Sequence, residues 1–267
     1  MNNTIFSPKN PDIPTEKNRF LTLCIEDESF SPPESSGIGT CNEKRIHRII
    51  KKLVCDDESC FEIKVGRYVA DVLCGNRITE IQTASFSNLI PKIRFYLENT
   101  DLDITVIYPL VAEKTLIRAD KESGELIRRS RSPKHLSPVD ALAELLYVSE
   151  FIGNPRFEIK LLMIRADEYR YSEKIRYRKK GAYDNDVIPR ELLDVCFIRS
   201  ADDVADIVPA GARDDNGHRA AELEKIFGYR GRKLYRALTC LVNLGIFQKV
   251  AEGKKNVKYY FTPPTIC

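Results

Sequence analysis

The chain has 267 residues, 43% of them hydrophobic, which suffices for one large domain or two ordinary domains with a buried core. Its 42 basic and 39 acidic residues leave a net charge of only +3, so a nucleic-acid surface has to arise from local clustering of basic residues. No stretch approaches twenty apolar residues, and Met1 to Asn10 lacks the charged-then-apolar order of a signal peptide, which argues against membrane insertion and secretion.

The cysteine usage indicates a reducing compartment. Eight cysteines are scattered along the chain, with no CxxC pair and no His/Cys group at zinc-finger spacing. We therefore expect reduced thiols in a cytoplasmic protein that has no membrane partner.

The first part of the chain is expected to be a mostly flexible arm. Residues 1–36 are rich in Asn, Ser, Glu and Pro, and only the run from Phe20 to Ile25 is apolar enough for a short strand or a docking segment. A folded domain is then expected over 37–165, a charged linker or hairpin over 166–187, and a second domain over 188–267.

The first domain is predicted to follow the order helix, three strands, helix, strand. Residues 43–54 have the apolar spacing of a helix with one buried face. A strand near 61–65 precedes a hairpin of two β-branched-rich runs, and a second amphipathic helix leads into a buried strand at 103–108. The predicted fold class is therefore α/β, with a mixed β-sheet flanked by helices.

Two carboxylates face one another across the predicted hairpin. If Gly75-Asn76 is the two-residue loop, residues whose numbers sum to 151 lie opposite, which pairs Asp71 with Glu80. Like charges directly opposite destabilise a sheet because their Cβ atoms are about 5 Å apart, and a hard divalent cation is the simplest compensation. Alternatively, a register shifted by one residue puts the two side chains on opposite faces of a solvated sheet.

The order of these acidic residues resembles a known nuclease family. Glu43 on the first helix, Asp71 on the second strand and Glu80-Ile81-Gln82 on the third are similar to the PD-(D/E)xK, or restriction-endonuclease-like, core. The similarity covers roughly residues 43–110 and matches the variants in which glutamine replaces the motif lysine.

The resemblance implies a metal-dependent phosphodiesterase. Asp71, Glu80 and the main-chain carbonyl of Ile81 would hold Mg²⁺ or Mn²⁺, and Glu43 would complete the ligand shell. Such an ion can activate a water molecule and neutralise the charge that develops on the phosphate. Alternatively, Glu43 belongs to a capping box that begins at Thr40 and only satisfies the first backbone N–H groups of the helix.

Gln82 departs from the family pattern because glutamine cannot carry the positive charge of the motif lysine, although it can still orient water. Lys92 on the following helix could supply that charge if its side chain points toward the site. His47 lies one turn after Glu43 and could act on phosphate or water. Alternatively, His47 is a packed helix residue.

Beyond the core, residues 112–137 are predicted to be an inserted loop, followed by a helix near 139–148 and a strand near 158–163. The loop carries Arg128 and Arg129, which could reach a phosphate backbone. A mobile charged loop is the alternative explanation of such a basic run.

The C-terminal part is predicted to contain helices at 190–197, 219–227 and 231–244 and then a β-hairpin. The run Leu-Val-Asn-Leu-Gly-Ile-Phe at 241–247, followed by this hairpin, resembles winged-helix domains. That resemblance implies a helix in the major groove and a wing on phosphate, with protein binding as the alternative. The basic residues expected to contact DNA are Arg230, Arg232, Lys233, Arg236, Lys254 and Lys255.

These patterns together predict a metal-dependent DNA endonuclease of restriction or defence type with a winged helix-turn-helix domain. DNA is the expected partner, and cutting both strands would need a homodimer or two separate events. Two alternatives stay open. One is a catalytically silent nuclease fold that regulates through DNA binding, suggested by Gln82, and the other is a protein-interaction module that acts through the winged helix.

Overall fold

The computed structural model describes residues 13–29, 41–120, 125–172, 185–214, 216–251 and 257–262. In this part of the chain, no helix is both long and apolar enough to cross a membrane. No disulfide joins the described cysteines 24, 55, 60, 74, 196 and 240.

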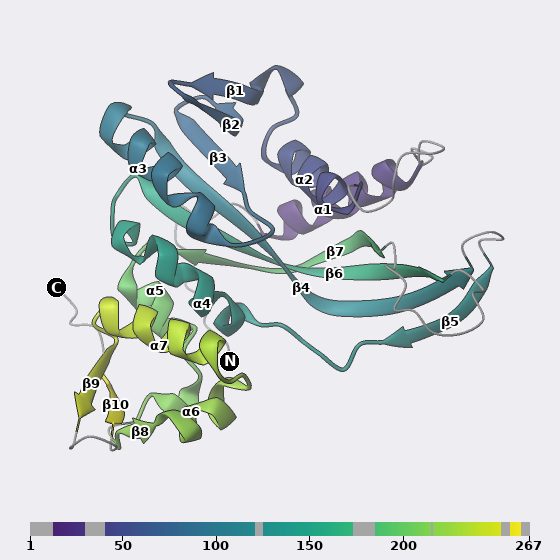
Figure 1. Cartoon of the computed structure of the whole chain (residues 1–267). Helices are drawn as coiled ribbons and strands as arrows, with labels where there is room; N and C mark the ends of the chain where they lie inside the picture. The colour runs from purple at the N-terminus through teal and green to yellow at the C-terminus, as the bar shows by residue number, and fades with distance from the viewer. Residues whose placement is uncertain are drawn as a thin grey trace. The chain divides into compact units, whose positions relative to one another are not determined.

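The fold is α/β, with a mixed sheet flanked by helices (Figure 1). The α-helices are α1 (Ile13–Ser29), α2 (Cys41–Val54), α3 (Ile90–Asn99), α4 (Leu142–Leu145), α5 (Ala201–Asp206), α6 (Ala220–Phe227) and α7 (Arg232–Asn243). The strands are β1 (Phe61–Val65), β2 (Tyr68–Cys74), β3 (Arg77–Ile81), β4 (Asp103–Asp120), β5 (Leu126–Arg131), β6 (Phe157–Ser172), β7 (Asn185–Ile198), β8 (His218–Arg219), β9 (Phe247–Ala251) and β10 (Val257–Phe261). Short 3-10 turns are η2 (Glu58–Cys60), η3 (Phe86–Asn88), η4 (Pro138–Ala141), η5 (Leu146–Phe151) and η6 (Ala210–Ala212).

Seven of the described strands form one sheet in the order β1-β2-β3-β4-β6-β7, and β5 pairs with β4. The sheet is mixed because β2 and β3 are antiparallel, β3 and β4 are parallel, and β4 and β5 are antiparallel.

The chain divides into two compact units, and the long strands β4, β6 and β7 each run from one unit into the other. Unit 1 comprises Met1–Phe61, Pro109–His135 and Leu162–Val195, and unit 2 comprises Glu62–Tyr108, Leu136–Leu161 and Cys196–Cys267.

In unit 1, α1 packs against α2, and this corrects the predicted flexible arm for residues 13–29. Phe20, Leu23 and Cys24 are buried, and their spacing of three and four residues places them on one helix face. Asp27, one turn further, forms ion pairs with Arg45 and Arg48 of α2. The apolar run is therefore a docking segment, but a helix and not a strand.

Two further predictions for local structure are wrong. The inserted loop predicted at 112–137 is largely strand, because β4 continues to Asp120 and β5 pairs back onto it, with Ile117 opposite Arg129. The helix predicted at 190–197 lies within β7. In both segments, pairing with a neighbouring strand overrides the local pattern.

The part of the predicted linker at 166–187 that is described also belongs to strands, β6 up to Ser172 and β7 from Asn185 onward. Residues 173–184 lie outside the described residues. The predicted domain bounds themselves stay a prediction.

Unit 2 confirms the predicted hairpin and its register. Val72 lies opposite Thr79, Leu73 opposite Ile78 and Cys74 opposite Arg77, so the paired numbers sum to 151. The two-residue loop begins at Gly75, whose φ of +58° is a conformation that glycine adopts without steric cost. The strand predicted near 61–65 is β1, and the predicted second helix is α3.

The C-terminal part of unit 2 contains the helix pair α6 and α7 and a small sheet in the order β8-β10-β9. Gly228, with φ +71°, ends α6, and β9 and β10 form the predicted hairpin. The buried residues Leu234, Leu238 and Leu241 of α7 form the core of this part, where α7 packs against α4, α6 and β9.

Candidate functional site

The hairpin of β2 and β3 positions the two predicted carboxylates. Its backbone pairing ends at Val72 and Thr79, and one step further Asp71 and Glu80 occupy the positions where the strands begin to separate. Asp71 Oδ2 accepts a hydrogen bond of 2.7 Å from the backbone N–H of Ile81. At this position a side chain of β2, and not its backbone, is therefore bonded to β3.

Glu80 is almost fully buried, with 2% of its side chain exposed, and two residues of α3 hold it. The ammonium group of Lys92 lies 2.5 Å from Glu80 Oε2, and the hydroxyl of Tyr96 donates to Oε1 at 3.4 Å. Lys92 and Tyr96 are four residues apart and therefore share one face of α3, which connects the parallel strands β3 and β4 (Figure 1).

The electrostatics of this cluster favour a partly protonated carboxyl group. Burial raises the pKa of Glu80 from its ordinary 4.5 to about 7, and the charge of Asp71 adds to the rise. The ion pair with Lys92 and the hydrogen bond from Tyr96 act in the opposite direction. Burial, followed by the nearby Glu80, also raises the pKa of Tyr96.

This pKa shift predicts a pH dependence of stability. Between about pH 4.5 and 7 the folded chain keeps a proton on Glu80 that the unfolded chain has released, so stability falls as pH rises through this window. The Glu80→Gln variant lacks this titration and serves as the reference. We expect the difference in free energy of unfolding between the wild type and Glu80→Gln to fall by about 2–3 kcal/mol between pH 4.5 and 8. Urea denaturation in EDTA measures this difference, and a difference that does not change with pH would contradict the shift.

The other predicted residues of the core are placed differently. Gln82 follows β3, and its side-chain amide donates to the Ser85 carbonyl at 2.6 Å, which holds the turn that leads into η3. Glu43 belongs to α2, but its side chain lies outside the described residues. His47 is half-buried on the same helix in unit 1. The roles of Glu43, His47 and the Ile81 carbonyl stay predictions.

Sequence reasoning missed Tyr96. The signal was present, because Lys92 and Tyr96 lie at positions i and i+4 of an amphipathic helix, next to the buried Ile93. A polar pair on the buried face of a helix needs a partner, since a buried polar group without a hydrogen bond destabilises the fold. Glu80 is that partner.

Two of the basic residues predicted to contact DNA form ion pairs inside unit 2. Lys233 lies 2.5 Å from Asp140 Oδ1 and 4.3 Å from the ring centre of Tyr229. Arg236 lies 3.6 Å from Glu144 Oε1, and its guanidinium group lies 4.7 Å from the ring centre of Tyr147.

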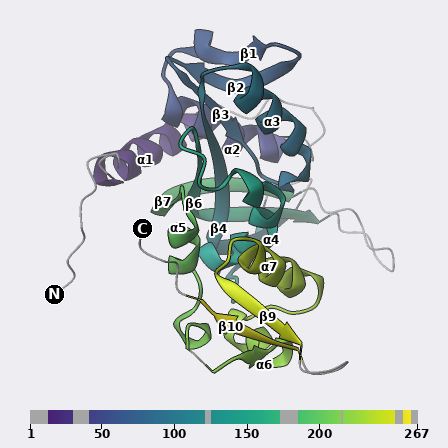
Figure 2. The same cartoon turned by 90° about the vertical axis from the view of Figure 1, so that its left-hand side faces the viewer.

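These contacts follow from the packing of α7 against α4, which both views show (Figure 1, Figure 2). The Tyr229 hydroxyl adds a hydrogen bond of 3.0 Å to the Val139 carbonyl. One cationic face of α7 is therefore engaged within the fold, whereas Arg230 and Arg232 are exposed.

The remaining predicted DNA contacts divide between strand β5 and the wing. Arg128 and Arg129 are exposed on β5 of unit 1, so they belong to a strand and not to a loop. Lys254 and Lys255 lie outside the described residues.

Comparison with known proteins gives a family without an assigned activity. The model of a domain of unknown function, DUF8091, matches residues 44–199, more than half of the chain. Neither the curated proteins nor the solved structures include a match. The matched range contains Asp71, Glu80 and Lys92 and ends before α6. The chain thus belongs to the family defined by DUF8091, a domain of unknown function.

Proposed function

We propose that the chain is a metal-dependent DNA endonuclease of restriction or defence type. The observation that supports this best is that Asp71 and Glu80 lie next to one another where the β2–β3 pairing ends, together with Lys92 reaching the Glu80 carboxylate from α3. The order of the elements adds support, since α2, β1 to β3, α3 and a β4 parallel to β3 follow the predicted nuclease order.

The donor set fits a hard divalent cation such as Mg²⁺ or Mn²⁺. It would consist of the Asp71 and Glu80 carboxylates and, as the nuclease resemblance implies, the carbonyl of Ile81, and these cations prefer oxygen ligands. Glu80 is already held by Lys92, so a cation at this carboxylate would share it with the ammonium group or replace that group. When bound, such an ion polarises the phosphate and lowers the pKa of a water molecule.

Lys92 provides the positive charge that Gln82 lacks. Its side chain is 17% exposed and its ammonium group lies 2.5 Å from the buried Glu80, so a phosphate bound beside Glu80 would meet a positive charge. The hydroxyl of Tyr96 lies 3.4 Å from the second oxygen of Glu80 and makes a weaker contact with it. Asp71 is half-buried and tied to the backbone of β3, which keeps it at the end of the hairpin pairing.

A cleavage assay tests this function. Supercoiled plasmid incubated with the full chain should become nicked or linear in Mg²⁺ or Mn²⁺ and stay intact in EDTA. Agarose electrophoresis measures the products. An intact plasmid with every divalent metal would contradict the proposal and favour a catalytically silent DNA-binding protein.

A second function, duplex binding through a winged helix, is favoured by the exposed face of α7. Helices α6 and α7 are followed by the β9–β10 hairpin, as in the predicted winged-helix order. Lys233 and Arg236 are paired within unit 2, so the DNA contacts of α7 would come from its other side. The exposed residues there are Arg232, Tyr235, Thr239 and Asn243.

This placement predicts which variants weaken duplex binding. Arg232→Ala should lower affinity for a labelled duplex of about 20 base pairs, and reduce the slope of log affinity against log salt by about 1 if Arg232 contacts a phosphate. Tyr235→Ala should also lower the affinity for the duplex, because Tyr235 is 56% exposed. Fluorescence anisotropy measures both. Lys233→Met serves as the contrast, because its charge is already paired with Asp140. Weaker binding in Lys233→Met alone would contradict the assignment.

A further inference from the structure

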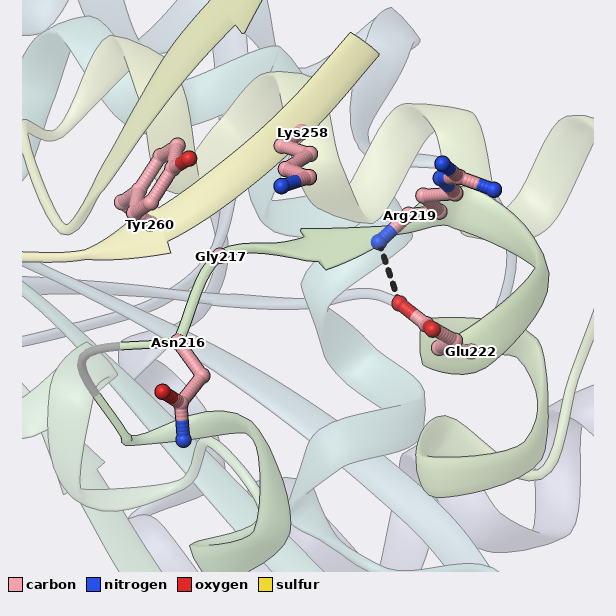
Figure 3. Close-up of a pocket in the computed structure, with 6 residues that line it drawn as sticks. All are labelled: Asn216, Gly217, Arg219, Glu222, Lys258 and Tyr260. Carbon is pink, nitrogen blue, oxygen red and sulfur yellow. Dashed lines mark hydrogen bonds between the residues drawn. The ribbon is translucent and has the colours of Figure 1, made fainter. Parts of the chain in front are cut away.

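Unit 2 contains an open cavity of about 570 Å³ between β8, β10 and the start of α6, far along the sequence from the carboxylate pair. Figure 3 shows Lys258 and Tyr260 on β10 across from Gly217 and Arg219. The residues that line the cavity are Asn216, Gly217, Arg219, Glu222, Lys258 and Tyr260.

Two basic residues are paired in the sheet at this cavity. The antiparallel register of β8 and β10 places Lys258 directly opposite Arg219. Both side chains line the cavity, so they bring two positive charges to it. Arginine and lysine are also the side chains that most often hold phosphate, through charge-assisted hydrogen bonds.

An aromatic ring lies beside these cations. Tyr260 is two residues after Lys258 and so projects from the same face of β10. A Cβ atom on Gly217 would lie 2.4 Å from two atoms of the Tyr260 ring, which shows that the ring rests against the glycine backbone. The ring therefore packs against the backbone of Gly217 in the lining of the cavity.

Polar groups complete the lining. Glu222 accepts a hydrogen bond of 2.7 Å from the backbone N–H of Arg219, which ties the first turn of α6 to β8 (Figure 3). The carboxamide of Asn216, on the other side of Gly217, offers both a donor and an acceptor. The cavity therefore combines two basic side chains, one carboxylate that is hydrogen-bonded to the backbone, an aromatic ring and an amide.

We propose that this cavity binds a nucleotide, with its phosphate at Arg219 and Lys258 and its base stacked on Tyr260. A volume of about 570 Å³ lies within the range of small-molecule sites. Stacking on an aromatic side chain is a recurring way of binding a base, and it adds to the attraction of the phosphate. The nucleotide is either free or part of a nucleic-acid strand. The proposal does not depend on the carboxylate site.

Calorimetric titration of the full chain in EDTA tests the site without cleavage. Adenosine monophosphate should bind with a saturable signal, more tightly than inorganic phosphate or adenosine alone, because each of these lacks one half of the recognition. Lys258→Gln and Tyr260→Leu should each weaken binding of the monophosphate about tenfold. A ten-residue oligothymidylate that competes identifies a strand as the source of the nucleotide, and its failure to compete identifies a free nucleotide.

Lys249→Gln is the matched control, because Lys249 is an exposed lysine of the neighbouring strand β9 that does not line the cavity. Its affinity should equal that of the wild type. Gly217→Ala should displace the ring and act like Tyr260→Leu, with thermal unfolding showing whether it folds. Absence of saturable binding in the wild type, or equal losses in Lys258→Gln and Lys249→Gln, would overturn the proposal.

Discussion

Lys92→Met should lower the free energy of unfolding by about 3–5 kcal/mol at pH 8, because it leaves Glu80 buried without its cationic partner. Only 2% of the Glu80 side chain is exposed, so water cannot replace the ammonium group. The hydrogen bond from Tyr96, at 3.4 Å, is too long to compensate for the loss. Urea denaturation measures the change in stability.

Two further variants separate this effect from a general sensitivity of α3. Arg94→Met removes an ion pair of 2.7 Å with Glu150 from the same helix, but both side chains are about half exposed, so the loss should stay below about 1 kcal/mol. In the double variant Glu80→Gln/Lys92→Met the buried charge is absent, and most of the lost stability should return. Equal losses in Lys92→Met and Arg94→Met would show that Glu80 does not need its partner.

Glu80→Gln should reduce metal-dependent plasmid cleavage by at least about a hundredfold, which corresponds to about 3 kcal/mol of transition-state stabilisation. The amide oxygen can accept from Lys92 while the amide nitrogen donates to the Tyr96 hydroxyl, so the fold should persist while the negative charge that attracts a cation is lost. Initial rates of nicking at saturating Mg²⁺ measure the effect.

The matched control is Glu98→Gln, which removes a carboxylate from an exposed position of α3 and should leave the cleavage rate unchanged. Far-ultraviolet circular dichroism of each variant shows whether the fold is retained. If Glu80→Gln is folded and cuts as fast as Glu98→Gln, Glu80 has no part in cleavage.

The hairpin could be predicted in detail because its determinants are local. Gly75-Asn76 sets a two-residue loop, and such a loop fixes the register of the three pairs that follow, from Cys74 opposite Arg77 to Val72 opposite Thr79. The helix pair α6 and α7 was predictable for a similar reason, since Gly228 ends α6 in a left-handed conformation.

The features that could not be predicted depend on contacts between distant parts of the sequence. Lys233 and Asp140 are 93 positions apart, so no local pattern shows that the cationic face of α7 is paired within the fold. The polar residues Arg128 and Arg129 predict a loop at β5, and only the pairing of β5 with β4 makes this segment a strand. Whether the side chain of Lys92 points toward Glu80 likewise depends on how α3 packs against β3.

The comparison of Asp71→Asn with the wild type tests the carboxylate site most directly. Asp71 is half-buried and bound to the Ile81 N–H, a contact that the side-chain oxygen of asparagine can keep, so the substitution changes charge more than structure. The expected result is a folded protein whose rate of plasmid nicking in Mg²⁺ is at least about a hundredfold lower. A folded Asp71→Asn protein that nicks plasmid at the wild-type rate would contradict a cation held between Asp71 and Glu80.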